Sequence, residues 1–508
     1  MTNVRVSAGR PGGARAEGVA VFFCEDRALF AAQRKRVAAE FPLPGRPLDG
    51  GSFSGKPGQS LVVHSAGPQA GTLFLVGLGP QGKLSREILR RGAGMAAKLA
   101  ETHRLRTLAL RPLPSADLLG SPLGKEDHPV RAFACAVAEG AILALYRFDT
   151  YLSKPVDRPR TLRRITVIGE SAAERREISR GVSYGTIVAE GTSLARDLAN
   201  APANEIYPES LASRARRVGR SSGVRVTVLG EKQIAAHRMG GLLGVSSGSQ
   251  RPPRFIIMEY NRPAARRGTI VLVGKGVTFD SGGISLKPSA GMAEMKMDMS
   301  GAAAVIATLG TAARLKVPLH LVGLAPATEN LPSGTALKPG DILRHMNGVT
   351  SEVDNTDAEG RLILADALAY AARYKPDLII DLATLTGACV VALGHLATGM
   401  MGTDERAMGT LRRSGDRTYE RVWELPLFEE YERLIKSDIA DVKNVGGRWA
   451  GAITAAMFLK KFVGTSPWIH LDIAGTAMLE EPSEYIPKGG TGVGVRLLID
   501  FLSHWKKG

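Results

Sequence analysis

Apolar and polar positions divide the first third of the chain into short strand-like runs and longer helical stretches. Between Val19 and Gly169 the apolar runs are VAVFF, LVVHS, TLFLVGLG, TLAL and RITVIG, and SREILRRGAGMAAKLAETH is a helical stretch between two of them. Strands separated by helices in this way are typical of an α/β sheet. The pattern therefore predicts a smaller N-terminal α/β domain with its own sheet over residues 1–170.

A second α/β domain is predicted over residues 199–508. Before it, residues 171–198 are polar, rich in Arg and Glu and spaced as a connecting helix, and NAPANEIYP follows as a loop. The later apolar runs are longer and uninterrupted: TIVLVGKGVTF, LHLVGLAPA, DLIIDLATL and WIHLDIAG. Strands buried on both faces have this pattern. We therefore expect a mixed or mostly parallel sheet covered by helices such as SGAAAVIATLGTAARL and GRLILADALAYAARY.

Composition is ordinary for a globular protein, with 44% apolar and 23% charged residues in 508. No apolar run is long enough to span a membrane. The basic N-terminus lacks the apolar core of a signal peptide. The three cysteines, Cys24, Cys135 and Cys389, form no CxxC pair. We expect a cytoplasmic protein without a membrane partner.

The formal net charge of +17 is concentrated in the first domain. Residues 1–197 hold 29 Lys and Arg against 18 Asp and Glu, a net charge of +11, and four arginines lie close together near the end of the domain: Arg158, Arg160, Arg163 and Arg164. Such an excess suits DNA, an acidic partner or an arginine-rich proteome. No basic run is interleaved with aromatic residues that stack on bases. All three interpretations stay open.

Charged residues gather at the ends of the long apolar runs of the second domain. They fall in two segments, GKGVTFDSGGISLKPSAGMAEMKMDMSG at 274–301 and NTDAEGRLILADAL at 355–368. The residues concerned are Lys275, Asp280, Lys287, Lys296 and Asp298 in the first segment, and Asp357, Glu359 and Arg361 in the second. In open α/β sheets, ligands bind beyond the carboxyl ends of the strands. Both segments are therefore candidates for one site.

Each acidic residue also has an ordinary structural interpretation. Asp357 could be an N-cap, Glu359 a first-turn acid that favours the helix dipole, and Asp280 part of a plain turn. These interpretations do not explain why charges crowd an otherwise apolar, glycine-rich region, where burial is costly unless the charge is paired or binds a metal. Carboxylates around one lysine suit Mn²⁺, Mg²⁺ or Zn²⁺. Neither segment contains histidine and no HExxH occurs, which disfavours a mononuclear zinc protease.

The segment NTDAEGRLILADAL resembles the signature of the leucyl aminopeptidase (cytosol aminopeptidase) family. GKGVTFDSGGISLKP, SDIADVKNVGGRWAGAITAAMFL, LATLTGA, HLDIAGTA and GGTGVGVR resemble the same family, so the similarity covers essentially all of 198–508. The resemblance implies a metallo-exopeptidase that removes N-terminal amino acids from peptides. It also implies a homohexamer.

By this resemblance, five side chains bind two divalent ions, Mn²⁺ or Zn²⁺, in each subunit. Lys275, Asp280, Asp298 and Glu359 bind one ion, whereas Asp280, Asp357 and Glu359 bind the other. A hydroxide that bridges two such ions can attack the scissile carbonyl. The two catalytic side chains implied outside the metal ligands are Lys287, which stabilises the oxyanion, and Arg361, which holds a bicarbonate as general base.

The resemblance also implies a pocket for the first side chain of the substrate. Its lining residues are Met295, Thr384, Leu385, Gly387, Ala474 and Ala477. Because these residues are mostly small or apolar, we expect leucine and other apolar residues to be preferred. The alternative interpretation of each is an ordinary core position.

The sequence also suggests two other roles. A DNA-binding regulatory or architectural protein that keeps a peptidase fold is a role known in the resembled family, and the basic first domain keeps it open. The segment GLGPQGK at 77–83 fits the GxxxxGK pattern of a phosphate-binding loop, but Leu84 stands where magnesium binding requires Ser or Thr. That segment is predicted to be a glycine turn.

Overall fold

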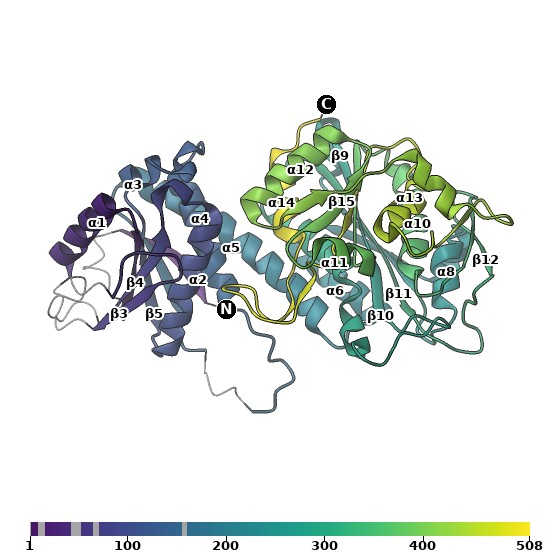
Figure 1. Cartoon of the computed structure of the whole chain (residues 1–508), viewed down its shortest axis with the longest axis horizontal. Coiled ribbons are helices and arrows are strands. Elements are labelled where there is room, and N and C mark those ends of the chain that lie inside the picture. The colour runs from purple at the N-terminus through teal and green to yellow at the C-terminus, as the bar shows by residue number, and fades with distance from the viewer. Residues whose placement is uncertain (1, 9–15, 42–51, 65–70, 155–159, 508) are drawn as a thin grey trace. The chain divides into compact units, whose positions relative to one another are not determined.

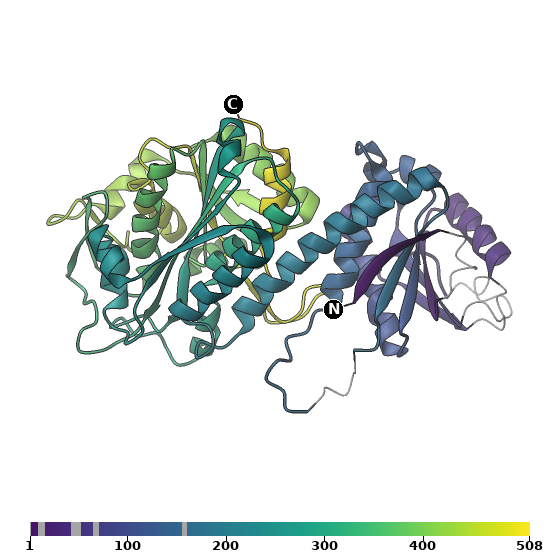
Figure 2. The same cartoon turned by 180° about the vertical axis from the view of Figure 1, so that it is seen from behind.

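The chain folds as two compact units, each built around its own sheet (Figure 1). The computed structural model describes residues 2–8, 16–41, 52–64, 71–154 and 160–507. The first unit comprises Met1–Glu190 and Glu481–Pro487, and the second comprises Gly191–Glu480 and Lys488–Gly508. Their boundary falls within α5 (Ala172–Asn200), which Figure 2 shows as one continuous helix. The predicted α/β class is confirmed for both units.

The first unit contains a six-stranded sheet in the order β1-β6-β5-β2-β4-β3. All neighbouring strands are parallel except β3, which is antiparallel to β4. The strands are β1 (Asn3–Ala8), β2 (Gly18–Cys24), β3 (Ser60–His64), β4 (Thr72–Gly79), β5 (Thr107–Arg111) and β6 (Arg164–Gly169). The apolar runs predicted β2 to β6, but β1 was missed because its side chains are mostly exposed and form no apolar run.

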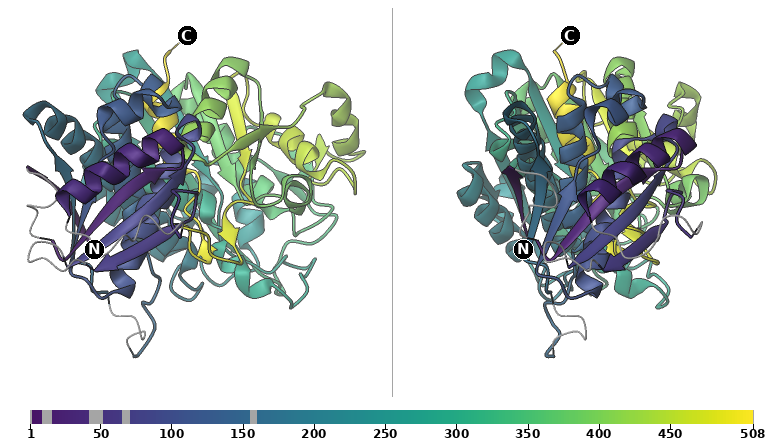
Figure 3. Two further views of the ribbon diagram at one scale, coloured as in Figure 1. Left: turned by 60° about the vertical axis from the view of Figure 1, so that its left-hand side comes forward. Right: turned by 90° about the vertical axis from the view of Figure 1, so that its left-hand side faces the viewer.

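Helices cover both faces of this sheet. They are α1 (Arg27–Glu40), α2 (Arg86–Thr102), α3 (Ser115–Leu119) and α4 (Pro129–Ala144). Ala20 and Phe22 belong to the core formed with α2 and α4, whereas the alternate residues Val19 and Val21 pack with Val37 of α1. Figure 3 shows α1, in purple, lying along its face of the sheet. The strict alternation of side chains along β2 thus builds two separate apolar layers.

The glycine-rich segment after β4 uses its backbone amides within the chain. Gly77 N donates to Gln59 O at 2.9 Å, and Gly79 N donates to Gly55 O at 2.8 Å. Leu84 is fully buried, and the Asp26 carboxylate accepts a hydrogen bond from the next free amide, Gln81 N, at 2.6 Å. The Asp26 carboxylate accepts the hydrogen bond from the amide that a bound phosphate would need, so this segment is a structural turn.

The second unit contains a nine-stranded mixed sheet in the order β16-β15-β18-β14-β9-β11-β8-β7, with β10 beside β11. Its centre, β18-β14-β9-β11, is parallel, and β8 and β15 are antiparallel to their neighbours β11 and β18. The strands are β7 (Arg225–Leu229), β8 (Arg254–Tyr260), β9 (Thr269–Gly274), β10 (Gly276–Asp280), β11 (His320–Asn330), β14 (Leu378–Ala383), β15 (Thr398–Gly402), β16 (Val422–Glu424) and β18 (Trp468–Asp472).

Figure 1 shows α12 and α14 on one side of this sheet and α8, α10 and α13 on the other. The helices are α6 (Pro208–Ser222), α7 (Glu231–Ala236), α8 (Gly240–Ser246), α9 (Ser300–Arg314), α10 (Glu359–Ala371), α11 (Gly387–Leu393), α12 (Glu405–Thr418), α13 (Gly451–Lys460) and α14 (Val495–His504). Short strands form two further sheets: β12 (Ile342–Arg344), β13 (Thr350–Glu352) and β17 (Val442–Lys443) in one, β19 (Met478–Leu479) and β20 (Gly489–Gly490) in the other. Among the described residues, no helix is long and apolar enough to cross a lipid bilayer.

The run TIVLVGKGVTF, which looked like one strand, is interrupted at Lys275. Before the break, β9 pairs with β14 and β11; after it, β10 pairs with the far end of β11. Lys275 itself donates its backbone N–H to Leu382 O at 3.0 Å. The break therefore opens the sheet at the carboxyl ends of its central strands, where α/β proteins bind ligands.

The segment Glu481–Pro487 leaves the second unit and packs in the first. Tyr485 is 2% exposed and lies in an apolar cluster with Leu143 and Ala189. Its hydroxyl donates to Glu87 Oε2 at 2.8 Å. This short piece of the second half of the chain is thus part of the core of the first unit.

Candidate metal centre

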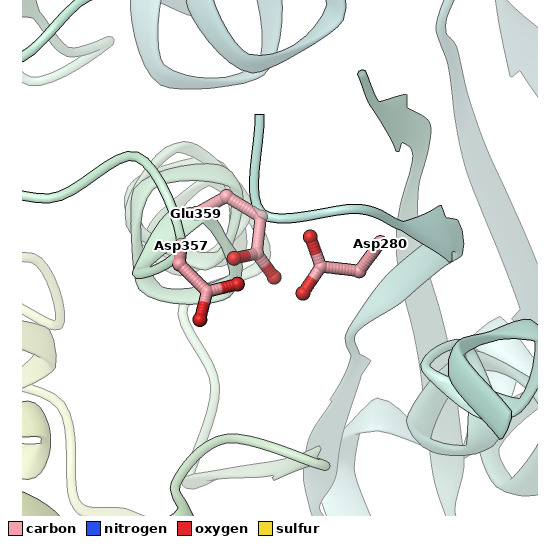
Figure 4. Close-up of side chains that lie close together, drawn as sticks. All are labelled: Asp280, Asp357 and Glu359. Carbon is pink, nitrogen blue, oxygen red and sulfur yellow. The ribbon is translucent and has the colours of Figure 1, made fainter. Parts of the chain in front are cut away.

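Three carboxylates meet at the opened edge of the larger sheet. Asp280 is the last residue of β10, Glu359 is the first residue of α10, and Asp357 lies just before that helix. One oxygen of each lies within 4.8 Å of the others (Figure 4). Residues from two distant segments of the sequence therefore converge, as the pattern of charged residues at strand ends predicted.

Lys275 enters this cluster from the break between β9 and β10. Its Nζ lies 2.8 Å from Asp298 Oδ2 and 2.9 Å from Glu359 Oε1, and it donates to Thr384 O at 2.9 Å. Burial alone would lower the pKa of Lys275, but the carboxylates of Asp298 and Glu359 outweigh burial and raise that pKa above its usual value. Lys275 thus joins Asp298 to the three converging carboxylates.

Lys287 lies at the more open side of the cluster. Its Nζ is 2.9 Å from Asp280 Oδ2 and also contacts Asp357 Oδ1. The side chain is 21% exposed. Burial lowers the pKa of Lys287, but the neighbouring carboxylates, Asp280 first, raise it above the usual value. A charged ammonium group is therefore held where it can meet a molecule arriving from solvent.

The donor set fits divalent cations. Four carboxylates face two ammonium groups, which leaves an excess of negative charge. Asp298 Oδ2, Asp357 Oδ1 and Glu359 Oε1 are buried, and within the described chain each meets a lysine ammonium group and no other donor. Burial raises the pKa of Asp298 and of Glu359, because an ionised carboxylate is poorly stabilised there. Clustered carboxylate oxygens with free lone pairs are the ligands that hard divalent ions prefer.

Two polar side chains orient the carboxylates: Asn330, which the sequence did not reveal, and Thr384, which was expected in the substrate pocket. Asn330, the last residue of β11, donates from Nδ2 to Asp280 Oδ1 at 2.8 Å and to Thr356 O at 3.1 Å. Thr384 Oγ1 donates to Asp298 Oδ1 at 2.7 Å. The position of Asn330, a polar residue ending an apolar strand as Asp280 does, was the available signal. Such partners fix the direction in which ligands point.

Arg361 is buried two residues after Glu359. Its Nη1 donates to Asn444 O at 2.6 Å, whereas its Nε has no partner in the described chain. Burial lowers the pKa of Arg361 to about 10, so the guanidinium stays charged near neutral pH. Asn444 also accepts from Asp354 N at 2.8 Å and donates to Asn355 O at 2.7 Å. The segment around Asn444 therefore supports both Arg361 and the loop that carries Asp357.

The ordinary interpretations of the acidic residues hold only in part. The N-cap of α10 is Ala358, and the Asp357 carboxylate contacts Lys287 instead of capping the helix. The turn after Asp280 is real: Gly282 has a φ of +89°, which favours glycine, and its N–H donates to Asp280 Oδ1 at 2.9 Å. The other oxygen of Asp280 faces Lys287. Turn formation and charge clustering therefore coexist at Asp280.

The residues expected to line the substrate pocket fall in three neighbouring places. Thr384, Leu385 and Gly387 follow β14, and Ala474 and Ala477 follow β18, its parallel neighbour. Met295 lies in a 3-10 helix, Met292–Met297, directly before Asp298. Thr384 and Ala477 are buried, and Gly387 is exposed. Their role in substrate binding stays a prediction.

Comparisons with known proteins agree with this fold. Residues 193–499 match the catalytic domain of the cytosol aminopeptidase family, and residues 46–155 match its N-terminal domain. A probable cytosol aminopeptidase of Geobacter sp. (strain M21) is 47% identical over 460 residues, 90% of this chain and 91% of the relative. One from Roseiflexus castenholzii is 46% identical over 474 residues, 92% of this chain and 94% of the relative.

Two solved structures are similar over nearly the whole chain. The bottromycin maturation enzyme BotP in complex with Mn gives a TM-score of 0.83 at 39% identity, covering 96% of this chain and 99% of that one. A mutant of tomato leucine aminopeptidase gives a TM-score of 0.85 at 31% identity, covering 99% of this chain and 97% of that one.

The fold and the site together define a metal-dependent hydrolase that acts at the N-terminus of peptides. The chain belongs to the cytosol aminopeptidase family, with both the catalytic and the N-terminal domain of that family present. The resemblance of its motifs to that family is thereby confirmed.

The close packing of Lys275 against α10 gives a first prediction. A Cβ added at Gly360 would lie 2.6 Å from Lys275 Cε and 2.8 Å from its Nζ. Gly360→Ala should therefore displace Lys275 and destabilise the protein by about 1–3 kcal/mol, the usual cost of overpacking, and should reduce bound metal. Denaturant unfolding and elemental analysis measure both effects.

Gly409→Ala is the matched control, since Gly409 lies within α12 and an added Cβ meets only Arg413 Nη1, at 3.8 Å. Alanine there should leave stability unchanged or raise it slightly. Equal stability and metal content in the two variants would contradict a packing role for Gly360.

Proposed function

We propose that this aminopeptidase removes leucine and other apolar residues from the N-termini of peptides with the aid of two divalent metal ions. The observation that carries the proposal is the convergence of one lysine and four carboxylates, three of them with a buried oxygen that meets only a lysine ammonium group, so that an excess of negative charge remains in the described chain. The five side chains are Lys275, Asp280, Asp298, Asp357 and Glu359.

We assign the two ions to overlapping sets of these side chains. Lys275, Asp280, Asp298 and Glu359 would hold one ion, and Asp280, Asp357 and Glu359 the other. Lys275 can act as a ligand only as a neutral amine, a form that nearby dications favour by repelling its proton. When bound, the ions supply Lewis acidity that activates water and polarises the scissile carbonyl. Manganese in the similar enzyme BotP supports Mn²⁺, and Zn²⁺ suits the same donor set.

Lys287 is assigned the stabilisation of the oxyanion. Its raised pKa keeps it charged, and its partial exposure places the ammonium group at the open side of the carboxylate cluster. A positive donor fixed in that place strengthens its interaction as the carbonyl oxygen of the substrate gains negative charge. Lys287 is thus a catalytic residue and Lys275 a ligand.

Arg361 is assigned the binding of a bicarbonate that serves as general base. With one nitrogen bonded to Asn444 O and Nε free of partners in the described chain, the guanidinium has donors left for a planar oxyanion. The carboxylates of the cluster are engaged by lysines or metal, so a base from outside the chain is required by the proposal.

The preference for apolar first residues rests on the turns after β14 and β18. Their small or apolar residues lie next to the carboxylate cluster, since Thr384 contacts both Lys275 and Asp298. A substrate whose free α-amine binds beside the carboxylates would direct its first side chain toward these turns. The requirement for that amine explains why the enzyme is an exopeptidase.

The homohexamer, the cytoplasmic location and DNA binding stay predictions. For DNA, the described arginines of the first unit offer little support because many are paired with acids, among them Arg36 with Asp117, Arg86 with Glu126 and Arg160 with Asp149. Arg158 lies outside the described residues. We therefore propose the peptidase alone.

The need for a free amine gives the test of the proposed function. Leu-Gly-Gly should be hydrolysed with release of leucine, whereas N-acetyl-Leu-Gly-Gly should be neither cleaved nor inhibitory at concentrations where the free peptide saturates. Product analysis by mass spectrometry measures both reactions. Cleavage of the blocked peptide at an internal bond would contradict the exopeptidase assignment.

The shared ligands predict that one substitution disturbs both ions. Glu359→Ala should retain clearly fewer than two metals per chain, and activity should nearly vanish. Elemental analysis of the purified variant gives the metal content. Glu424→Ala, which removes an exposed partner of Arg412 on the surface, is the control and should keep metal and activity. Two retained metals with normal turnover in Glu359→Ala would refute the assignment.

Lys287 should matter for turnover and not for metal. Lys287→Met is expected to keep its metals while kcat falls about 10²–10³-fold, the usual loss for one oxyanion donor. Steady-state kinetics with elemental analysis separate the two effects, and the exposed Lys338 provides the control variant Lys338→Met. Loss of metal with little change in kcat would exchange the roles of Lys275 and Lys287.

A further inference from the structure

Asp472 is a buried carboxylate outside the metal cluster, at the last position of β18. Its Oδ1 accepts hydrogen bonds from Leu385 N and Ala474 N, both at 3.1 Å. Its Oδ2 accepts from Thr386 Oγ1 at 2.6 Å. One side chain thus binds the turn after β14 and the turn after β18.

The backbone pairing of the two strands ends at this point. Ala383 is the partner of Asp472 in the parallel ladder, and Ile473 N donates to Ala383 O at 2.8 Å. The ladder between the strands ends there, and beyond it the Asp472 carboxylate joins the two turns. Thr386 extends the link, because its hydroxyl also accepts from Cys389 N at 3.0 Å and caps α11.

Different groups hold the two parts of the turn after β14: the part next to the metal ligands and the part next to the proposed pocket. Thr384 is fixed by Asp298 and Lys275, whereas Leu385 and Thr386 are fixed by Asp472. Removal of the Asp472 carboxylate therefore frees the second part of the turn and leaves the contacts of Thr384 with the metal ligands. The two effects are separable in an experiment.

Asp381, a second buried carboxylate of this sheet, differs from Asp472 in its hydrogen-bond partners. It lies on β14 and is as fully buried as Asp472, but its oxygens contact Trp468 Nε1 at 2.7 Å and His470 Nδ1 at 2.6 Å, both within β18. It joins strand to strand inside the core. None of the ion pairs among described residues includes Asp472, so its charge is stabilised by the turn amides and Thr386, with a longer-range attraction from the buried Arg361 guanidinium.

We propose that Asp472 is a positioning residue that sets the width of the pocket for the first side chain of the substrate, and so the selectivity of the enzyme. The proposal rests on the proposed function, because Leu385 and Ala474 line that pocket only if the assignment above is right. Asp472 touches no reacting atom and acts through the two turns. A change at Asp472 should therefore alter discrimination between substrates more than metal binding.

The test compares kcat/KM for leucyl and alanyl p-nitroanilides in the full-length, metal-loaded enzyme. Asp472→Ala should lower the ratio of leucyl to alanyl kcat/KM by about 10-fold or more, the scale of a well-formed apolar pocket, while two metals per chain remain. Asp472→Asn keeps an oxygen acceptor for the amides and should restore most of the ratio. Asp381→Asn should lower the unfolding temperature but leave the ratio unchanged.

Thr386→Val keeps the test decisive if Asp472→Ala does not fold. It replaces the hydroxyl by a methyl group of similar size, and it should reduce the same ratio, which Thr386→Ser should restore. An unchanged ratio in Asp472→Ala or Thr386→Val with full metal content, or an equal change in Asp381→Asn, would overturn the proposal. A wild-type enzyme without preference for the leucyl substrate would instead refute the proposed function, before any variant is compared.

Discussion

Mutual repulsion among clustered carboxylates is the constraint on which the site depends. Asp280, Asp357 and Glu359 bring oxygens within 4.8 Å of one another, a separation at which two unit charges repel by roughly 3–4 kcal/mol at an effective dielectric constant of about 20. Several such pairs would consume much of the roughly 5–15 kcal/mol that stabilises a folded domain. Lys275 and Lys287 offset part of this repulsion, and bound dications would offset the rest. Metal binding should therefore stabilise the folded state of this unit.

The backbone brings the charges together by ending strands at one place. β9 stops at Lys275, β10 ends at Asp280, and α10 begins at Glu359. Gly360 lets the side chain of Lys275 pass against the helix. The glycine at this position thus follows from how closely α10 must approach a buried ammonium group.

Much of this arrangement could be predicted from the sequence, because strand ends and charge are local properties. Long apolar runs indicated the central strands, and the polar residues that followed them indicated the cluster at Asp280 and Glu359. Asn330 and Asp472 were not predicted as partners, since their roles depend on which strands become neighbours. β1 was missed because an exposed strand carries no apolar pattern. The break at Lys275 was not predicted either, because Gly and Lys between two apolar runs do not indicate which strands β9 and β10 will each pair with.

The passage of Glu481–Pro487 into the first unit makes the two units inseparable as pieces of sequence. Tyr485 completes a small apolar cluster with Leu143 and Ala189, and a chain that begins at Gly191 carries this tyrosine without the cluster it belongs to. The same loop leaves the second unit just after β19 and returns to pair with it at β20. A gene rearrangement that exchanged the N-terminal half for another would therefore have to replace this distant loop as well.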